Sequence, residues 1–264
     1  MINEKILEEY NTVKNNVGLF DFSFEGKIKV RGEGRIDFVN GIVSNNIKNL
    51  KENFSIYAAF LDKFGRVLSD CHIYKFNDFL LVTLPFTQKN KILKKLKNEA
   101  ALVKSEVEDI TLKYALLSLQ GPKSSLLLGS MFNEKLNLEN LQFIIKKIIN
   151  VEIVIIKSKR SSLDCYDLFF KGENYNEILN LILEKGKNYN IKKINNETYD
   201  ILRLETGIPL FGIDFDEKTV LSEVGEEAIS YEKGCYTGQE VIARIKNIGK
   251  GITAKRLMKL ETSF

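Results

Sequence analysis

The sequence predicts an α+β fold in which mixed β-sheets carry helices on one side. Two stretches of similar length, residues 67–96 and residues 151–182, have the same order of a β-hairpin followed by a helix. In both stretches the strand segments are short and rich in apolar residues, whereas the helical segments repeat their apolar residues every three or four positions. Because a hairpin and a helix bury their apolar faces against each other, the recurring order indicates two α+β subdomains, although the residues themselves do not repeat.

The N-terminal part of the chain predicts a helix, a strand and a second helix. Apolar residues at helical spacing indicate a helix within residues 1–17, which Gly18 ends. Alternating apolar residues over residues 24–31 indicate a strand. A glycine-rich turn at residues 32–34 then leads into an amphipathic helix over residues 35–44.

The next part of the chain contains the first hairpin and its helix. Residues 58–66 predict a strand that runs into a turn. Residues 67–76 and 79–85 are two apolar strand segments, and the Asn-Asp pair between them is a hairpin signal. Thr87 is placed to cap the following helix, whose apolar residues lie on one face.

The second subdomain begins with another strand and another glycine turn. Residues 116–120 predict a strand, and Pro122 fits the first position of a helix after the turn. Residues 151–157 and 163–170 predict the second pair of strands, and apolar residues at 178–182 predict the helix that follows them.

The stretch around Cys235 predicts an exposed thiol beside the start of a short helix. Thr237 and Glu240 have the spacing of a capping box, and apolar residues at helical spacing continue to Gly249. Cys235 then lies just outside the helix N-terminus, where the helix dipole favours negative charge, and Lys233 adds a cation nearby. Both effects favour the thiolate and predict a reactive cysteine. The alternative is a buried structural cysteine in a glycine turn.

Composition excludes several kinds of site. The three cysteines, Cys71, Cys165 and Cys235, are far apart and odd in number, which argues against a disulfide framework and against a cysteine-based metal centre within one chain. His72 is the sole histidine, so a histidine-based metal site is not expected. No run of about eighteen apolar residues predicts a membrane span. A reducing cytoplasm fits this composition.

Residues 233–240 read KGCYTGQE, and this string resembles the signature of the YgfZ-type folate-binding proteins. Those proteins are relatives of the T-protein, the aminomethyltransferase of the glycine cleavage system. Residues 18–50 and 116–122 are similar to corresponding passages of the same family, as are residues 203–209, which read RLETGIP. The resemblance implies a GcvT/YgfZ-like fold of several subdomains around a central folate site.

The resemblance also implies a division of the chain. Residues 1–113 are expected to form an N-terminal folate-binding subdomain, and residues 114–198 a second α+β, ferredoxin-like subdomain. Residues 199–252, with the KGCYTGQE string, are expected to pack back on the first subdomain. Residues 253–264, which include a strand-like segment, match only the start of the C-terminal barrel that family members carry, so this barrel is expected to be absent or truncated.

The cofactor that the resemblance implies is tetrahydrofolate or a derivative of it. Residues 65–70 resemble the T-protein segment that carries a catalytic aspartate, with Ser69-Asp70 where T-proteins have two acids in tandem. No metal is expected. The implied catalytic residues are Cys235 and Asp70, and the implied folate-binding residues are Asp70, Arg160, Arg203, Tyr236, Gln239 and Glu240.

Each of these residues also has a structural interpretation. Asp70 can be a carboxylate at a strand end, and Arg160 with Asp167 can be surface charges on a hairpin. Arg203 can pair with Glu205. Glu240 can pair with a residue four positions later on the same helix face, Arg244.

Three functions follow from the resemblance. The first is a tetrahydrofolate-binding accessory protein that supports iron–sulfur cluster assembly or repair through a reactive Cys235, with assembly proteins or their clients as partners. The alternative is a folate-dependent aminomethyltransferase of the T-protein kind. The third is a tRNA-modification factor, indicated by relatives and by the net charge of +4. Catalytic turnover is left open by the sequence.

Overall fold

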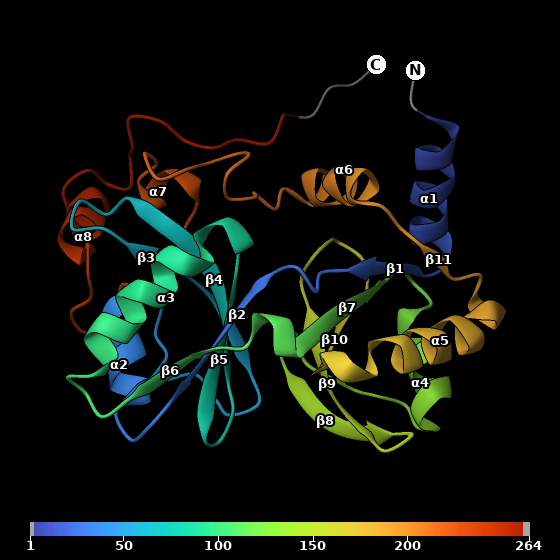
Figure 1. The fold of residues 1–264 in the computed structure, drawn as a ribbon. Coiled ribbons are helices and arrows are strands. Elements are labelled where there is room, and N and C mark those ends of the chain that lie inside the picture. Colours follow the sequence, from blue (N-terminus) through green and yellow to red (C-terminus); the bar gives the residue numbers. More distant parts are fainter. Residues whose placement is uncertain (1–2, 261–264) are drawn as a thin grey trace. The chain divides into compact units, whose positions relative to one another are not determined.

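The computed structural model describes residues 3–260 and divides the chain into two compact units. Unit 1 contains Met1–Phe24 and Thr111–Ile208, and unit 2 contains Glu25–Ile110 and Pro209–Phe264. The chain therefore enters unit 1, builds most of unit 2, returns to complete unit 1 and ends in unit 2 (Figure 1). Each unit has its own sheet, helices and apolar core, which confirms the α+β class.

Unit 1 is built on a six-stranded sheet with the strand order β11-β1-β7-β10-β9-β8. The pairs within it are antiparallel except for β1 with β11, which is parallel. The strands are β1 (Gly18–Asp21), β7 (Tyr114–Gln120), β8 (Phe143–Ile148), β9 (Val151–Ser158), β10 (Cys165–Lys171) and β11 (Lys192–Lys193).

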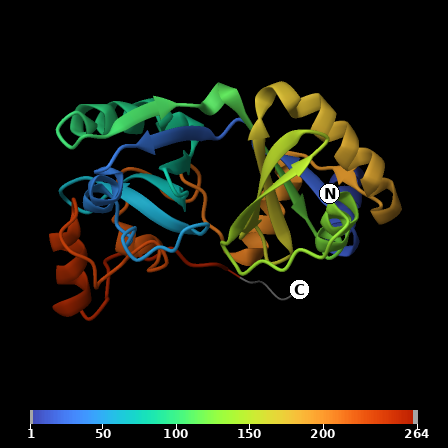
Figure 2. The ribbon, with the colours of Figure 1, turned by 90° about the horizontal axis from the view of Figure 1, so that it is seen from below.

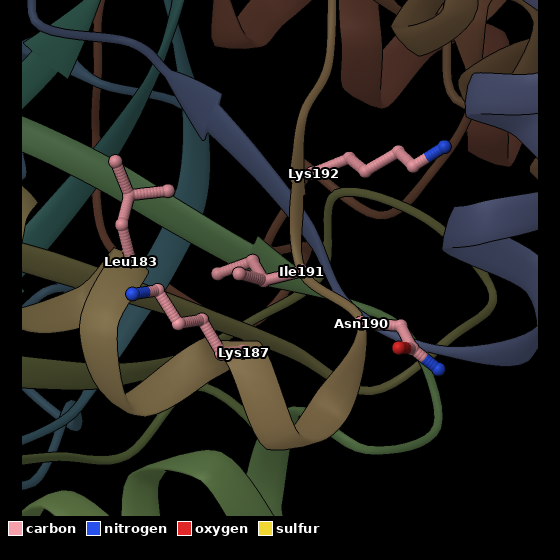
Figure 3. A pocket seen from close by; sticks show the side chains of 5 residues that line it. All are labelled: Leu183, Lys187, Asn190, Ile191 and Lys192. Carbon is pink, nitrogen blue, oxygen red and sulfur yellow. The ribbon is translucent and has the colours of Figure 1, made fainter.

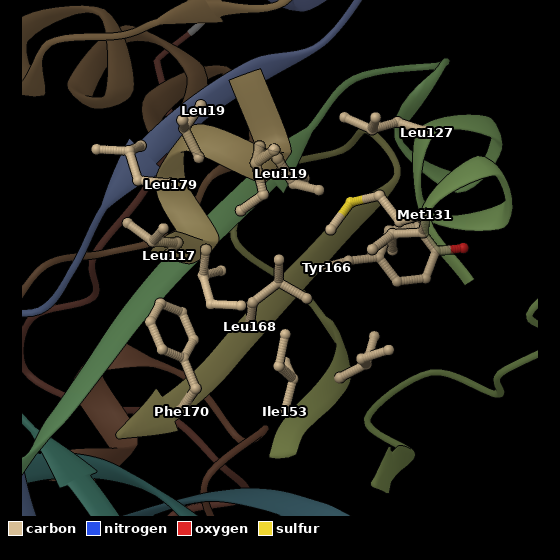
Figure 4. Packing of buried hydrophobic residues seen from close by; sticks show 14 of the residues in the cluster. Leu19, Leu117, Leu119, Leu127, Met131, Ile153, Tyr166, Leu168, Phe170 and Leu179 are labelled. Carbon is tan, nitrogen blue, oxygen red and sulfur yellow. The ribbon is translucent and has the colours of Figure 1, made fainter. Parts of the chain in front are cut away.

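Helices cover the sheet of unit 1, and an apolar core lies beneath two of them. The helices are α1 (Glu4–Asn15), α4 (Ser124–Phe132), α5 (Tyr175–Gly186) and α6 (Asn196–Thr206). Side chains of α4 and α5 pack with alternate residues of the central strands, among them Leu117 and Leu168. Figure 4 shows Met131 of α4 directed toward Tyr166 of β10. Full burial of each such large apolar side chain contributes about 1.5–3 kcal/mol.

Unit 2 is built on a five-stranded antiparallel sheet with the order β3-β4-β5-β2-β6. Its strands are β2 (Gly26–Arg31), β3 (Ser55–Leu61), β4 (Val67–Lys75), β5 (Phe79–Leu84) and β6 (Glu106–Asp109). Its helices are α2 (Arg35–Ile42), α3 (Phe86–Ala100), α7 (Leu221–Val224) and α8 (Gln239–Asn247).

The two faces of the unit 2 sheet have different surroundings. One face buries alternate strand residues, such as Ile28, Phe60 and Ile73, against α2 and α3; Figure 2 shows α3 lying along the sheet beside β6. A second apolar cluster joins Ala59 and Leu61 of β3 to residues of the C-terminal segment, including Tyr236. The C-terminal segment thus packs on the β3–β4 side of its own unit.

Most of the observed helices and strands follow the local sequence pattern. The differences arise where pairing between distant segments determines to which unit an element belongs. The hairpin of β4 and β5 with α3, and that of β9 and β10 with α5, are confirmed. Residues 1–24 were expected in one subdomain with residues 25–113, but β1 pairs along its length with β7 and so belongs to unit 1. Likewise α6 belongs to unit 1 rather than to the C-terminal segment.

Two further expectations differ from the structure. Residues 253–260, expected as the start of a barrel, contain no helix or strand, and residues 261–264 lie outside the described part of the chain. The helix expected to be capped by Thr87 begins at Phe86, after Pro85. Pro85 has no backbone N–H to donate to the sheet, so β5 ends before it, and the N-cap residue is Pro85, two positions before Thr87.

Candidate functional site

Asp70 and Tyr57 form a hydrogen-bonded pair on one face of the unit 2 sheet. Tyr57 lies on β3 and Asp70 on β4, two strands that pair directly. Their neighbours Ala58 and Cys71 point into the core beneath α2 and α3, so Tyr57 and Asp70 project from the opposite face. The Tyr57 hydroxyl donates to Oδ2 of Asp70 over 3.0 Å.

The Asp70 carboxylate is poorly satisfied within the protein. Its Oδ1 atom is buried and has no hydrogen-bond partner among the described residues. Burial raises the pKa of Asp70 to about 6; the hydrogen bond from Tyr57 opposes this rise, and the charge of Glu25 adds to it. A buried acceptor without a donor is costly unless a ligand or water supplies one. A carboxyl group with such a pKa can also exchange a proton near neutral pH.

Aromatic and polar side chains extend the same face of the sheet. His72 lies opposite Tyr57 in the strand register, and their ring centroids are 5.2 Å apart. Thr83 of β5 lies opposite His72, and Lys27 of β2 lies opposite Thr83. The sequence interpretation did not include Tyr57 or Lys27 among the residues that lie in register across this face of the sheet. Alternation along each strand could have placed them on the non-core face, but only the strand pairing brings them into register.

The sequence predicted Lys233 as a cation beside the Cys235 thiol, but the structure binds its ammonium to backbone carbonyl oxygens. Its ammonium donates to the backbone carbonyl oxygens of Asn40, Val43 and Asn45, at 2.5, 2.7 and 2.9 Å. These carbonyls lie in the last turn of α2 and just beyond it, where carbonyl oxygens lack helical partners. Lys233 is 6% exposed, and burial lowers its pKa to about 8. Its three donors are therefore committed to the end of α2.

Cys235 is exposed, whereas Cys71 and Cys165 are buried. The alternative of Cys235 as a buried structural cysteine is therefore wrong. The residues on either side hold the turn in place: Lys233 is clamped to α2, and the backbone N–H of Thr237 donates to the carbonyl oxygen of Gly41 over 3.3 Å. The thiol is thus presented to solvent from a turn that is fixed at both ends.

The capping box expected at Thr237 and Glu240 is not formed. Helix α8 starts at Gln239, and its N-cap residue is Gly238, which has a φ of +83° and makes no side-chain capping bond. A Cβ atom at Gly238 would lie 2.5 Å from the carbonyl oxygen of Asp62, so the close approach to β3 requires glycine here. Glu240 instead pairs with Arg244 at 3.8 Å, which confirms the expected intrahelical ion pair.

The other folate-binding candidates of the KGCYTGQE string, Tyr236 and Gln239, support the turn. Tyr236 is buried in the apolar cluster on β3, and the Lys233 ammonium lies 4.8 Å from its ring centroid. Burial raises the pKa of Tyr236 to about 12. The Gln239 side-chain amide donates to the carbonyl oxygen of Lys233 over 3.5 Å.

Asn45 connects the Asp70 pair to the Cys235 turn. Its side-chain amide donates to the backbone carbonyl oxygen of Tyr57 over 2.9 Å, and its own carbonyl oxygen accepts from Lys233. A continuous set of hydrogen bonds therefore runs from Asp70 through Tyr57 and Asn45 to Lys233, two residues before the thiol. Unit 2 brings the two catalytic candidates into one hydrogen-bonded framework.

Arg160 and Asp167 form an ion pair in unit 1, in which Asp167 is buried. Arg160 Nε donates to Asp167 Oδ2 over 2.7 Å, and Ser158 donates to Oδ1 over 2.9 Å. The Arg160 guanidinium also lies over the ring of Phe22, 4.0 Å from its centroid. Asp167 is only 1% exposed, so the interpretation of the pair as surface charges is wrong.

Arg203 is also held inside unit 1. It donates to the carboxylate of Asp200 at 2.5 Å and to the carbonyl oxygen of Ile208 at 3.1 Å. Asp200 lies three residues before Arg203 and therefore shares its helix face. Glu205, the partner that the sequence offered for Arg203, accepts from the ammonium of Lys14 at 3.2 Å.

Unit 1 also carries a surface pocket. It is lined by Leu183, Lys187, Asn190, Ile191 and Lys192 (Figure 3). Lys192 extends away from the other lining side chains and pairs with Glu8. None of the residues implied by the family resemblance lines this pocket.

Within residues 3–260, no cluster of three or more His, Cys, Asp or Glu side chains is arranged to hold a metal ion. In the same part of the chain, every helix is too short or too polar to cross a membrane.

Curated relatives share most of this chain. It is 30% identical over 250 residues to an aminomethyltransferase of Caldanaerobacter subterraneus subsp. tengcongensis, an alignment that covers 93% of this chain and 67% of the relative. It is 26% identical over 262 residues to an aminomethyltransferase of Pseudothermotoga lettingae, with 98% and 71% covered. The chain thus spans about two thirds of the length of these relatives.

Solved structures share the fold, and a family profile assigns the family. The glycine cleavage system aminomethyltransferase T from Bartonella henselae superposes with a TM-score of 0.82 at 19% identity, covering 91% of this chain and 66% of that one. The heterotetrameric sarcosine oxidase from Corynebacterium sp. U-96 superposes with a TM-score of 0.51 at 12% identity, covering 73% and 96%. The profile of the GCVT N-terminal domain matches residues 2–231. The chain therefore belongs to the GCVT N-terminal domain family.

Proposed function

We propose that this chain binds tetrahydrofolate and takes part in folate-dependent one-carbon transfer of the aminomethyltransferase kind. The curated relatives that carry this name support the activity. The structural observation that carries the proposal is the Asp70 carboxylate, whose buried Oδ1 lacks a partner among the described residues.

The residues around Asp70 fit a reduced pteridine. The pyrimidine ring of a reduced pteridine is flat and carries N–H donors along its edge, so an unsatisfied carboxylate oxygen is a suitable acceptor. Tyr57 and His72 supply aromatic surface on the same face of the sheet. When bound, tetrahydrofolate supplies the nitrogen atoms that accept a one-carbon unit. The role assigned to Asp70 is to orient the ring and to hold or release a proton at Oδ1.

A titration of the purified protein with tetrahydrofolate under anaerobic conditions tests the binding. Asp70→Asn keeps the shape of the side chain but removes its charge, and we expect it to weaken binding roughly 10- to 100-fold, as loss of a charge-assisted hydrogen bond does. Asp109→Asn is a matched control on β6, where the carboxylate pairs with Lys89. Absence of saturable tetrahydrofolate binding to the unsubstituted protein would reject the proposal.

The transfer itself needs a separate assay. With an aminomethyl-loaded lipoyl carrier protein and tetrahydrofolate, the unsubstituted chain should form methylene-tetrahydrofolate, release ammonia and leave the lipoyl group of the carrier as its reduced dithiol. Folate binding without this product would retain the binding site but reject the aminomethyltransferase activity for this chain.

A second candidate function is favoured by the exposed Cys235 in its fixed turn. It is a YgfZ-type accessory role in which folate is bound without turnover and the thiol supports iron–sulfur enzymes. In cells that lack the native protein, Cys235→Ser should fail to restore iron–sulfur enzyme activity while its folate affinity stays unchanged. Cys165→Ser, in unit 1, is the control. Full restoration by Cys235→Ser would reject this role. The tRNA interpretation, which the sequence based on relatives and on the net charge, has no specific structural observation in its favour.

A further inference from the structure

We propose that Tyr57 is the positioning residue for Asp70, because its hydroxyl holds Oδ2 and so leaves Oδ1 as the oxygen that faces a ligand. This inference rests on the proposed function for the identity of the ligand, but the positioning itself can be measured without any ligand. Tyr57 is not among the residues that the family resemblance implied.

The geometry of the pair supports this role. Tyr57 reaches Asp70 diagonally, because the strand register places Ala59 opposite Asp70 and Tyr57 opposite His72. The hydroxyl can therefore contact one carboxylate oxygen, Oδ2, at 3.0 Å. The other oxygen, Oδ1, is buried without a partner among the described residues.

Tyr57 is fixed at both of its ends. The Asn45 side-chain amide holds its backbone carbonyl oxygen at 2.9 Å, and its ring packs against the apolar cluster that contains Tyr236. Burial and the nearby Asp70 charge raise the pKa of the Tyr57 hydroxyl well above its usual value. The hydroxyl thus stays protonated and acts as a permanent donor to Asp70.

The charged and titratable groups around Asp70 come from three segments. Tyr57 approaches from β3, Glu25 acts from the segment before β2, and Cys71 and His72 are the neighbours on β4. Burial is the main cause that disfavours the carboxylate, Glu25 adds to it, and the Tyr57 hydrogen bond acts against both. Loss of the Tyr57 hydroxyl should therefore raise the pKa of Asp70 further and free the carboxyl group to rotate.

The direct test is a carboxyl ¹³C NMR titration of the ligand-free protein, with Asp70→Asn used to assign the Asp70 signal. We expect a midpoint near pH 6 in the unsubstituted protein and a midpoint higher by roughly half a unit or more in Tyr57→Phe. Tyr231→Phe is the matched control, since its hydroxyl also donates to a carboxylate, that of Glu226, elsewhere in unit 2. An Asp70 midpoint that is equal in Tyr57→Phe and Tyr231→Phe would overturn the proposal.

A ligand titration then links the positioning to function. Carboxylate Oδ1 accepts N–H donors best, so tetrahydrofolate affinity should fall as pH drops through the Asp70 midpoint. In Tyr57→Phe this fall should begin at higher pH, with a loss of about threefold at pH 5 that shrinks toward pH 8. A loss that is equal at both pH values would indicate a purely structural role for Tyr57. If tetrahydrofolate does not bind at all, the proposed function fails while the NMR result still decides the positioning.

A second measurement removes the dependence on the folding of Tyr57→Phe. The ring ¹³Cζ signal of Tyr57 reports its hydrogen bond, so in the unsubstituted protein it should titrate with the same midpoint as Asp70. The titration should disappear in Asp70→Asn. A Tyr57 signal that does not respond between pH 5 and pH 7 would overturn the proposal.

Discussion

The ammonium group of Lys233 donates to the backbone carbonyl oxygen of Val43 over 2.7 Å, across a separation of 190 residues in the sequence. With the bonds to Asn40 and Asn45, this contact caps the C-terminal end of α2 and fixes the turn that presents Cys235. A lysine in this place supplies one donor for each of three carbonyl oxygens. The same residue that the sequence associates with thiol chemistry therefore acts as a clamp between distant segments.

Lys233→Met should destabilise unit 2 by about 2–4 kcal/mol, because two buried carbonyl oxygens and one partly buried carbonyl oxygen lose a charged donor. Denaturant unfolding at pH 7 measures this loss. The control is Lys246→Met, which removes an exposed pair with Glu226 and should cost at most about 1 kcal/mol. Equal losses in the two variants would contradict the clamp.

Asp70→Asn should make the protein more stable at pH 7, even though it weakens folate binding. A folded-state pKa raised from 3.8 to about 6 means that the folded protein binds protons more tightly than the unfolded chain. The contribution of Asp70 to the stability of the folded protein is therefore full below pH 3.8 and is lost as pH rises through 6. We expect the variant to be more stable by about 1–3 kcal/mol at pH 7 and equal to the unsubstituted protein near pH 4. Thermal unfolding of both proteins between pH 4 and pH 7 measures this difference in stability. A difference that does not change with pH would refute the prediction.

Gly238→Ala should destabilise the protein by about 2 kcal/mol or more, because the φ of +83° and the Asp62 carbonyl oxygen 2.5 Å from the new Cβ both oppose a side chain. Gly234→Ala is the control in the same turn, since a Cβ there meets nothing within 4 Å. The comparison requires only equilibrium unfolding of the two variants. Similar stability of both would show that α8 can start without the close approach to Asp62.

Native alkylation should modify one cysteine in each chain. Cys235 is exposed, whereas Cys71 and Cys165 are buried. Iodoacetamide treatment followed by peptide mass spectrometry should therefore label Cys235 within the native protein and the other two only after denaturation. Prompt labelling of Cys71 or Cys165 in the native protein would contradict the burial of those thiols.

Much of the fold is predictable from local pattern. The two hairpin–helix units, the turn after β2 and the extent of α8 all follow from apolar spacing and glycine position, because these features depend on neighbours within a few residues. The GCVT family was also accessible, since the strand and turn passages that carry the resemblance are contiguous in the sequence. The YgfZ assignment remains a prediction that rests on residues 233–240.

Other features depended on contacts between segments that are distant in the chain. Strand β1 joins the sheet of unit 1 through β7, and β8 joins it through β9, although neither strand has a strong pattern of its own. The division into units follows from that pairing and not from the order of the elements.

The candidate site shows the same division. Local pattern identified Asp70 and Cys235 as residues of interest, because each lies in a short recognisable string. The donor to Asp70 and the acceptors of Lys233 emerge only from tertiary structure, since Tyr57 and Val43 lie 13 and 190 residues away from their partners. Periodicity says which face a side chain occupies, but a hydrogen bond is specified by distance and direction, and these exist only once the strands have paired and the C-terminal segment has packed on them.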